Sequence, residues 1–249
     1  MKILALDSTT RSACAALCED DCCLAKTTLD AKHTHSETLL PMIAHLCELT
    51  HIPIAETDAF AVTVGPGSFT GVRIGVSTIK GLAFGQGKPC YAISTLEALA
   101  QNAARLFGIL VPVLDARRSQ VYSACFRSAE NGTVQRLTED DLLPIPELVS
   151  RLAAYGEPIR LLGDAADSVS QAAQAQGIPL LPVPSLLRAP DAASVAYCAY
   201  TKIQAHEAPL SDVTLAPVYL RPSQAERERA ERVAAQSQKT EASVPVSSK

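Results

Sequence analysis

The stretch Ala59-Phe60-Ala61-Val62-Thr63-Val64-Gly65-Pro66-Gly67-Ser68-Phe69-Thr70-Gly71 decides the fold. Its first part, residues 59–64, is an apolar run of the length and composition of a buried strand. The glycines and the proline that follow mark a tight loop. Beyond the loop, apolar residues recur at helical spacing to about Phe84. The stretch therefore predicts a strand that passes through a glycine-rich loop into a helix.

Upstream of this stretch, the sequence predicts three strands and a helix. Residues 2–7, 12–18 and 22–29 are short and apolar, with a turn-like acidic segment between the last two. A helix is expected over 35–50, because Thr34 and a glutamate three residues later form a capping box ahead of an apolar stripe. Pro41 lies near its beginning, where we expect a kink.

Downstream, strands are predicted over 89–93, 109–115, 120–126, 133–138 and 159–162, and helices over 95–106, 146–154, 165–176 and 191–206. The order of a strand ending in Asp, a hairpin and then helices occurs twice, at Asp7 and at Asp115. We therefore expect an α/β fold of two related lobes, residues 1–106 and 107–222, with mixed sheets flanked by helices. Residues 223–249 are expected to be a disordered tail, because they contain too little apolar surface to fold.

Composition excludes several classes of protein. Among 249 residues the net charge is -4, aromatic residues make up 4% and Trp is absent, so neither a basic patch nor a stacking surface for nucleic acid is expected. No apolar run approaches the ~20 residues that span a bilayer. The eight cysteines are scattered without a Cys-x-x-Cys pair, which favours buried thiols in a cytoplasmic protein. If this chain serves an RNA, we expect it to do so through a partner.

Two segments suggest a site for a phosphate group. The glycine-rich loop would bring free N–H groups to a helix N-terminus, and Asp7-Ser8-Thr9-Thr10 follows the first strand. The alternative is that the glycines only permit a tight turn and the hydroxyls only close a hairpin. The loop matches neither a Walker loop nor a dinucleotide fingerprint. The residues of the phosphate or nucleotide hypothesis are Asp7, Ser8, Thr9, Gly65, Gly67, Ser68 and Thr70.

The two predicted helices also suggest a protein interface. Gly71, Gly75, Gly81 and Gly85 lie in or near the helix that ends at about Phe84. Glycine inside a helix costs about 1 kcal/mol relative to Ala, which a close approach of another helix would explain. The alternative is that both apolar stripes are core. His33 and His35 could ligate a metal together, but the sequence offers no third ligand nearby.

Several segments together resemble the TsaB (YeaZ) family. They are Ile3–Thr10, His35–Pro41 and Gly65–Gly75, followed by Leu114–Arg117 with Val121-Tyr122, and Pro217–Arg221 near the end. The resemblance covers about residues 2–221 in the right order, and its glycine-rich element is the most specific part. It implies the actin/Hsp70/sugar-kinase (ASKHA) fold, which agrees with the repeated pattern of strand and Asp.

The resemblance implies a role in tRNA modification. The family binds a related catalytic subunit, TsaD, which forms N6-threonylcarbamoyladenosine (t6A) at position 37 of tRNAs decoding ANN codons; the ATPase TsaE joins them. It further implies a homodimer when the chain is alone, and contact through the first two helices. The interface residues expected on those helices are His35, Leu39, Ile43, Leu46, Val72, Gly75, Val76 and Ile79. Gly75→Leu is then expected to abolish assembly and to leave the fold intact.

Two departures from related patterns bear on function. The catalytic relatives carry a second metal-binding His where this chain has Leu39, so we expect no catalysis, no metal and no required cofactor, with weak ATP or ADP binding left open. The family usually has Gly-Glu where this chain has Ser119-Gln120, which leaves any role of that acidic residue without support.

Two rival functions are considered. A nucleotide-dependent kinase or ATPase of the same fold would use Asp7 and the glycine-rich loop, but Asp115 is followed by Ala-Arg-Arg rather than by a phosphate-binding loop. A peptidase would need a catalytic triad or a zinc motif, and no His-Glu-x-x-His occurs.

Overall fold

The computed structural model describes residues 1–30, 34–129, 132 and 134–221. Residues 1–218 form one compact unit, and of the segment that follows only residues 219–221 are described. The expected tail, 223–249, lies outside the described residues. None of the helices in the described ranges combines the length and the apolar character that crossing a membrane requires.

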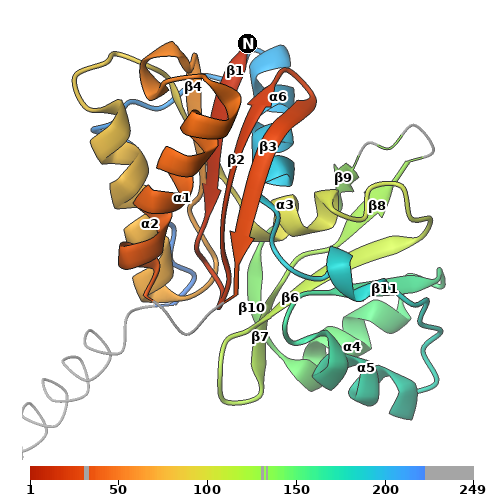
Figure 1. Ribbon diagram of the computed structural model, residues 1–249. Coiled ribbons are helices and arrows are strands. Elements are labelled where there is room, and N and C mark those ends of the chain that lie inside the picture. Colours follow the sequence, from red (N-terminus) through yellow and green to blue (C-terminus); the bar gives the residue numbers. More distant parts are fainter. Residues whose placement is uncertain (31–33, 130–131, 133, 222–249) are drawn as a thin grey trace, which may run out of the picture. The chain divides into compact units, whose positions relative to one another are not determined.

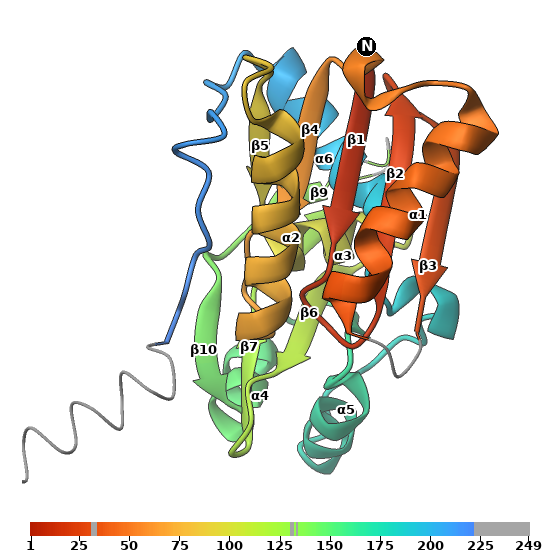
Figure 2. The same ribbon diagram turned by 60° about the vertical axis from the view of Figure 1, so that its left-hand side comes forward.

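The first sheet has five strands in the order β3-β2-β1-β4-β5 (Figures 1 and 2). Antiparallel pairing joins β1, β2 and β3, while β1, β4 and β5 are parallel. The bounds are β1 Lys2–Asp7, β2 Ala13–Glu19, β3 Cys22–Leu29, β4 Ala59–Thr63 and β5 Cys90–Ile93. Every strand predicted in this region is confirmed to within one or two residues.

Helices cover both faces of this sheet, which is why its inner strands are apolar throughout. Leu4 and Leu6 of β1 pack with helices α1 (His35–Thr50) and α2 (Phe69–Ala83). Their neighbours Ile3 and Ala5 face the opposite side, where α6 (Ala192–Gln204) packs. Figure 2 shows α1 and α2 side by side on one face. A strand buried on both faces reads as a continuous apolar run, as residues 2–7 do.

The second sheet is built around β6 (Ile109–Asp115), whose neighbours are interrupted strands. Both β7 (Gln120–Ser123) and β8 (Phe126–Ser128) pair with β6 in one register, with Ala124 and Cys125 between them. The next strands of the sheet are β9 (Val134–Arg136), which pairs with β8, and β10 (Asp141–Pro144), which pairs with β7. Residues 137–140 separate β9 from β10. β11 (Ile159–Leu162) pairs with the free edge of β6 in parallel.

The predicted duplication is visible in this order of elements. β6, β7/β8, β9/β10, α4 (Ile145–Ala153), β11 and α5 (Ala166–Ala175) repeat the order β1, β2, β3, α1, β4, α2. An isolated parallel bridge from Leu180 to Ile159 lies where β5 pairs with β4 in the first sheet. The third helices are exchanged: α3 (Thr95–Gln101) packs on β6, and α6 packs on β1 and β2. The lobe limits 1–106 and 107–222 remain a prediction from sequence.

Three expectations need correction. The strand predicted over 120–126 is interrupted at 124–125, and β10 was not predicted because its residues lack alternation. The helix predicted over 95–106 ends at Gln101, beyond which the chain forms turns. Helix α1 has the predicted bounds, and Glu37 accepts a hydrogen bond from the Thr34 amide at 3.4 Å, as a capping box requires. Of the eight free cysteines, five are buried, while Cys22 and Cys23 are exposed.

Candidate functional site

The turn after β1 places a carboxylate in the interior. Asp7 is fully buried, and Oδ1 accepts hydrogen bonds from the Thr9 amide at 2.9 Å and from the Thr9 hydroxyl at 3.0 Å. Burial raises the pKa of Asp7, and the hydrogen bonds from Thr9 offset part of that effect. The turn is therefore held by its own Asp, as the hairpin-closing interpretation of this segment predicts.

The glycine-rich loop packs directly on that turn. The Ser68 amide donates to the Thr9 carbonyl at 2.7 Å, and the Ser8 hydroxyl donates to the Gly71 carbonyl at 2.8 Å. At the start of α2, the Ser68 hydroxyl accepts from the Gly71 amide at 3.3 Å. Two N–H groups that a phosphate would use are thus bound within the chain.

The contact between α2 and the turn after β1 requires glycine at two positions of the helix. A Cβ on Gly71 would overlap the Ser8 carbonyl, and a Cβ on Gly75 would lie 2.5 Å from the Ser8 hydroxyl oxygen and 3.4 Å from a Val62 methyl. The small residues of α2 therefore serve the contact between the helix and the β1–β2 turn.

The structure brings the predicted phosphate-site residues together without leaving them open. Asp7, Ser8 and Thr9 are each at most 1% exposed, whereas Ser68 and Thr70 lie on the surface. These contacts favour the structural interpretation of the loop. Binding of ATP or ADP here stays a prediction.

His35 and Leu39, the positions that a metal centre would use, both have other roles. His35 Nε2 donates to the Thr10 carbonyl at 2.9 Å, and Leu39 is 1% exposed within the first core. His33 lies outside the described residues. The part of the chain that the structure describes contains no cluster of ligands for a metal ion.

Most of the interface residues expected on α1 and α2 face the chain's own sheet. All of them except His35 are buried in the core, and of the buried ones Leu39 also lines a groove on the outer side of the two helices. Burial removes the others from contact with a partner. The physical reason is that the apolar stripe of a helix faces the nearest apolar layer, here the first sheet. The inward-facing residues are Leu39, Ile43, Leu46, Val72, Gly75, Val76 and Ile79. The expectation that Gly75→Leu leaves the fold intact is therefore wrong.

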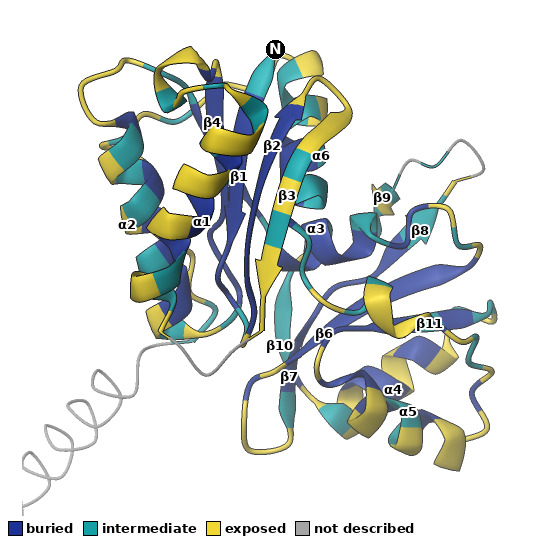
Figure 3. Ribbon diagram, viewed as in Figure 1, coloured by how far each residue is buried: buried dark blue, intermediate teal, exposed yellow. Residues whose placement is uncertain are grey.

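The outer side of the same helices carries a groove of about 620 Å³. It runs between α1 and α2, and its wall is mostly apolar or small, with Arg73 as its charged residue. Figure 3 shows exposed residues along both helices on this side. Among the residues that the structure describes, a Cβ on Gly81 would meet nothing within 4 Å, so packing against them does not require glycine here. The groove is lined by Ser36, Leu39, Leu40, Arg73, Ile74, Ser77, Thr78, Gly81 and Leu82.

The sequence also contains a signal for this groove, on residues other than most of those expected at the interface. Leu40 and Leu82 are apolar residues off the main stripes, and Leu40 is 54% exposed. Gly81 is a helical glycine whose position the core does not require. The position of these residues around the helix axis places them on a different face from the stripe that packs on the core.

The two similar halves, each a mixed sheet with helices, define the class of actin/Hsp70/sugar-kinase-like (ASKHA) proteins. Comparison with known proteins narrows the class. The family model described as TsaD, tRNA N6-adenosine threonylcarbamoyltransferase, matches residues 29–240. A Bacillus subtilis protein named tRNA threonylcarbamoyladenosine biosynthesis protein TsaB is 32% identical over 66% of this chain and 71% of its own length.

Further relatives agree. The Escherichia coli protein of the same name is 36% identical over 60% of this chain and 64% of its own length. The solved structure of YeaZ from Pseudomonas aeruginosa has a TM-score of 0.74 and 28% identity, covering 88% of this chain and 99% of that one. The chain belongs to the TsaB (YeaZ) branch of the TsaD-related family.

Proposed function

We propose that this chain is the non-catalytic partner subunit that binds TsaD in the formation of t6A at position 37 of tRNAs decoding ANN codons. The observation that carries the proposal is the groove between α1 and α2 in a member of the TsaB family. Its curated relatives are named for t6A biosynthesis.

The groove suits a helix of a related protein. Its small and apolar wall lets a second helix approach closely, and the exposed Gly81 removes the side chain that would hold such a helix away. The family model that matches this chain is described as TsaD, which indicates that the two proteins are related. TsaD would therefore offer an equivalent pair of helices. In the absence of TsaD, a second copy of this chain would offer the same surface and form a homodimer.

The absence of catalysis is supported by what occupies the metal-binding positions of the catalytic relatives. Leu39 stands where they carry a second His, and its side chain is buried in the core. The ring of His35 already donates to the Thr10 carbonyl. The proposal therefore requires no metal and no cofactor in this subunit.

The remaining components follow from charge and from the family. A chain of net charge -4 with few aromatic residues has little to hold RNA, so tRNA contact would be indirect, through TsaD. TsaE would join as the ATPase, and the complex would work in the cytoplasm.

Reconstitution tests the proposal. TsaD, TsaE, tRNA, ATP and threonylcarbamoyl-adenylate are combined with and without this chain, and modified adenosine is measured. Modification that depends on this chain, together with no activity of the chain alone, is the expected result. Equal modification without the chain would overturn the partner role and return attention to a nucleotide-dependent kinase or ATPase.

A further inference from the structure

The second half contains a cavity where its sheet is interrupted. Between β7 and β8, Ala124 and Cys125 leave the regular ladder, and residues 137–140 do the same between β9 and β10. A cavity of about 600 Å³ opens at this gap, between the interrupted strands and α4. That volume lies within the range of small-molecule sites, about 300–1,000 Å³. Nothing in the proposed function uses it.

The floor of the cavity is apolar. Leu143 and Leu148 are buried beneath it, at 6% and 2% exposure, and both belong to the core of the second half. Ala154, at the end of α4, lies on the surface and lines the wall. An aliphatic or aromatic body would therefore find a surface against which to lose water.

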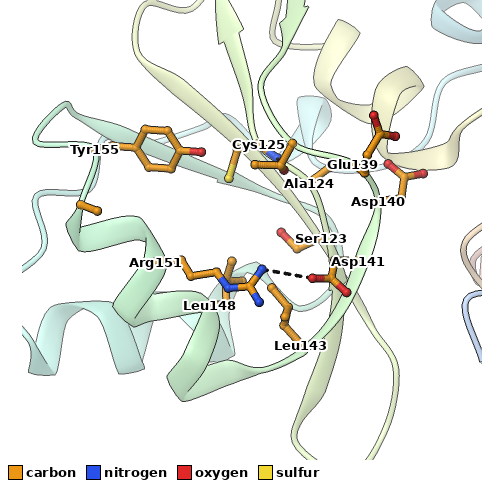
Figure 4. A pocket seen from close by; sticks show the side chains of 12 residues that line it. Ser123, Ala124, Cys125, Glu139, Asp140, Asp141, Leu143, Leu148, Arg151 and Tyr155 are labelled. Carbon is orange, nitrogen blue, oxygen red and sulfur yellow. Dashed lines mark hydrogen bonds and ion pairs between the residues drawn. The ribbon is translucent and has the colours of Figure 1, made fainter.

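One end of the cavity is neutral. Tyr155 and Cys125 lie together there, with the Tyr155 hydroxyl directed toward the Cys125 thiol (Figure 4). Burial, with the thiol contact, raises the pKa of Tyr155 to about 12. Both groups are therefore uncharged at neutral pH.

The other end carries three consecutive carboxylates, of which two are already paired. Asp140 lies 2.6 Å from Arg136, and Asp141 lies 3.1 Å from Arg151, which also pairs with Glu147 at 2.6 Å. Among the residues that the structure describes, Glu139 has no cationic partner. Figure 4 shows Glu139 and Asp140 at the end opposite Tyr155. The mouth of the cavity thus has one carboxylate left for a cation.

We propose that this cavity binds a small organic cation, with its ammonium group at Glu139 and its apolar body over Leu143 and Leu148. A carboxylate ligand of the same shape would face Glu139, while Arg151, the cation of the lining, is already paired with Asp141 and Glu147. The site lies in the second half and is independent of the groove between α1 and α2.

The test compares three probes of equal length by NMR titration of the full chain: hexylammonium, 1-hexanol and hexanoate. We expect hexylammonium to bind most tightly, with shifts at residues 123–125 and 138–141, hexanol to bind more weakly and hexanoate not to bind. Equal affinity for all three probes, or shifts confined to other parts of the chain, would overturn the proposal.

Variants separate charge from shape. Glu139→Gln should weaken hexylammonium binding about threefold, the size of one exposed ion pair, without changing the affinity for hexanol. Ala154→Trp should abolish binding of both, because the indole fills the cavity, and an unchanged melting temperature would show that the fold is intact. The matched control Glu48→Gln, an exposed residue on α1, should bind as the parent does. An unchanged affinity for hexylammonium in Glu139→Gln would contradict the placement of the ammonium.

Discussion

The two halves of this protein have equivalent helix pairs with different outer faces. In the first half, α1 and α2 have 16 and 15 residues and enclose a mostly apolar groove on their outer side. In the second half, α4 and α5 have 9 and 10 residues, and their exposed positions are mostly polar, among them Ser150, Asp167, Gln171 and Gln174. Of these two helix pairs, the one in the first half therefore has the outer face better suited to an apolar partner.

The turns that follow the first strand of each half differ as well. In the first half, Asp7 is buried beneath the glycine-rich loop. In the second half, Asp115 is exposed and accepts the Arg117 amide at 2.8 Å, in a turn where Arg117, Arg118 and Ser119 have φ of 66°, 57° and 57°. One turn has become part of the core and the other has remained a surface hairpin. Duplication alone thus does not determine the role of a position.

The largest expected effect is on the inner face of α2. Gly75→Leu should destabilise the fold by about 2–3 kcal/mol, because its side chain would enter the space of Ser8 and Val62. Urea unfolding measures this, with Gly81→Ala as the control that adds a methyl group on the outer side. Equal stability of the Gly75→Leu variant and the parent would show that the inner face is not core.

The burial of Asp7 should make the stability of the fold depend on pH. The folded state raises the pKa of Asp7 above the ordinary value of 3.8, so the folded chain holds this proton more tightly than the unfolded chain. Stability from this group therefore falls as the pH rises from about 3.8 through the folded pKa, and stays lower above it. Asp7→Asn should gain stability relative to the parent across that window, measured by urea unfolding at a series of pH values. A relative loss with rising pH would contradict the burial of an ionisable Asp7.

A glycine in the exposed turn of the second half should stabilise the fold. Ser119→Gly is expected to stabilise the chain by about 1 kcal/mol, because a side chain at positive φ is strained and glycine is not. The rise in melting temperature should be about 2–4 °C. A fall would show that the Ser119 side chain contributes more than its backbone strain costs.

The smallest effect is expected on the outer face of α5. Gln171→Leu adds an exposed apolar side chain where the account places no partner, so stability should change by less than about 0.5 kcal/mol. Affinity for TsaD, measured by calorimetry, should stay unchanged. A tenfold loss of affinity would move the partner surface to the second half.

The sequence predicted most of the fold because the strands are apolar runs with clear ends. Residues 2–7 and 109–115 each end in Asp after a run that is buried on both faces, and the capping box at Thr34 located the start of α1. The interruption of the strands in the second sheet was harder to predict from the sequence. The gap at Ala124 and Cys125 preserves the apolar pattern, so nothing in the spacing marks the break.

The proposed partner surface lies on the two helices that the sequence indicated, but it shares only Leu39 with the interface residues expected there. A stripe such as Val72, Val76 and Ile79 has the same spacing whether it packs on the chain's own sheet or on another chain. Only the fold shows that this stripe packs against the chain's own sheet, and that Gly81, unlike Gly75, faces outward. The cavity at Glu139 depends on the pairing of two interrupted strands and had no signal in the sequence.

The affinity of Gly81→Leu for TsaD, measured beside that of Gln171→Leu, shows whether the groove between α1 and α2 is the partner surface. A Cβ at position 81 meets nothing within 4 Å among the described residues, and leucine favours a helix over glycine, so the variant should fold at least as stably as the parent. If α1 and α2 receive a helix of TsaD, its side chain should lower the affinity at least about tenfold, or about 1.4 kcal/mol, while Gln171→Leu binds normally. Normal binding by a folded Gly81→Leu variant would show that TsaD does not bind in this groove.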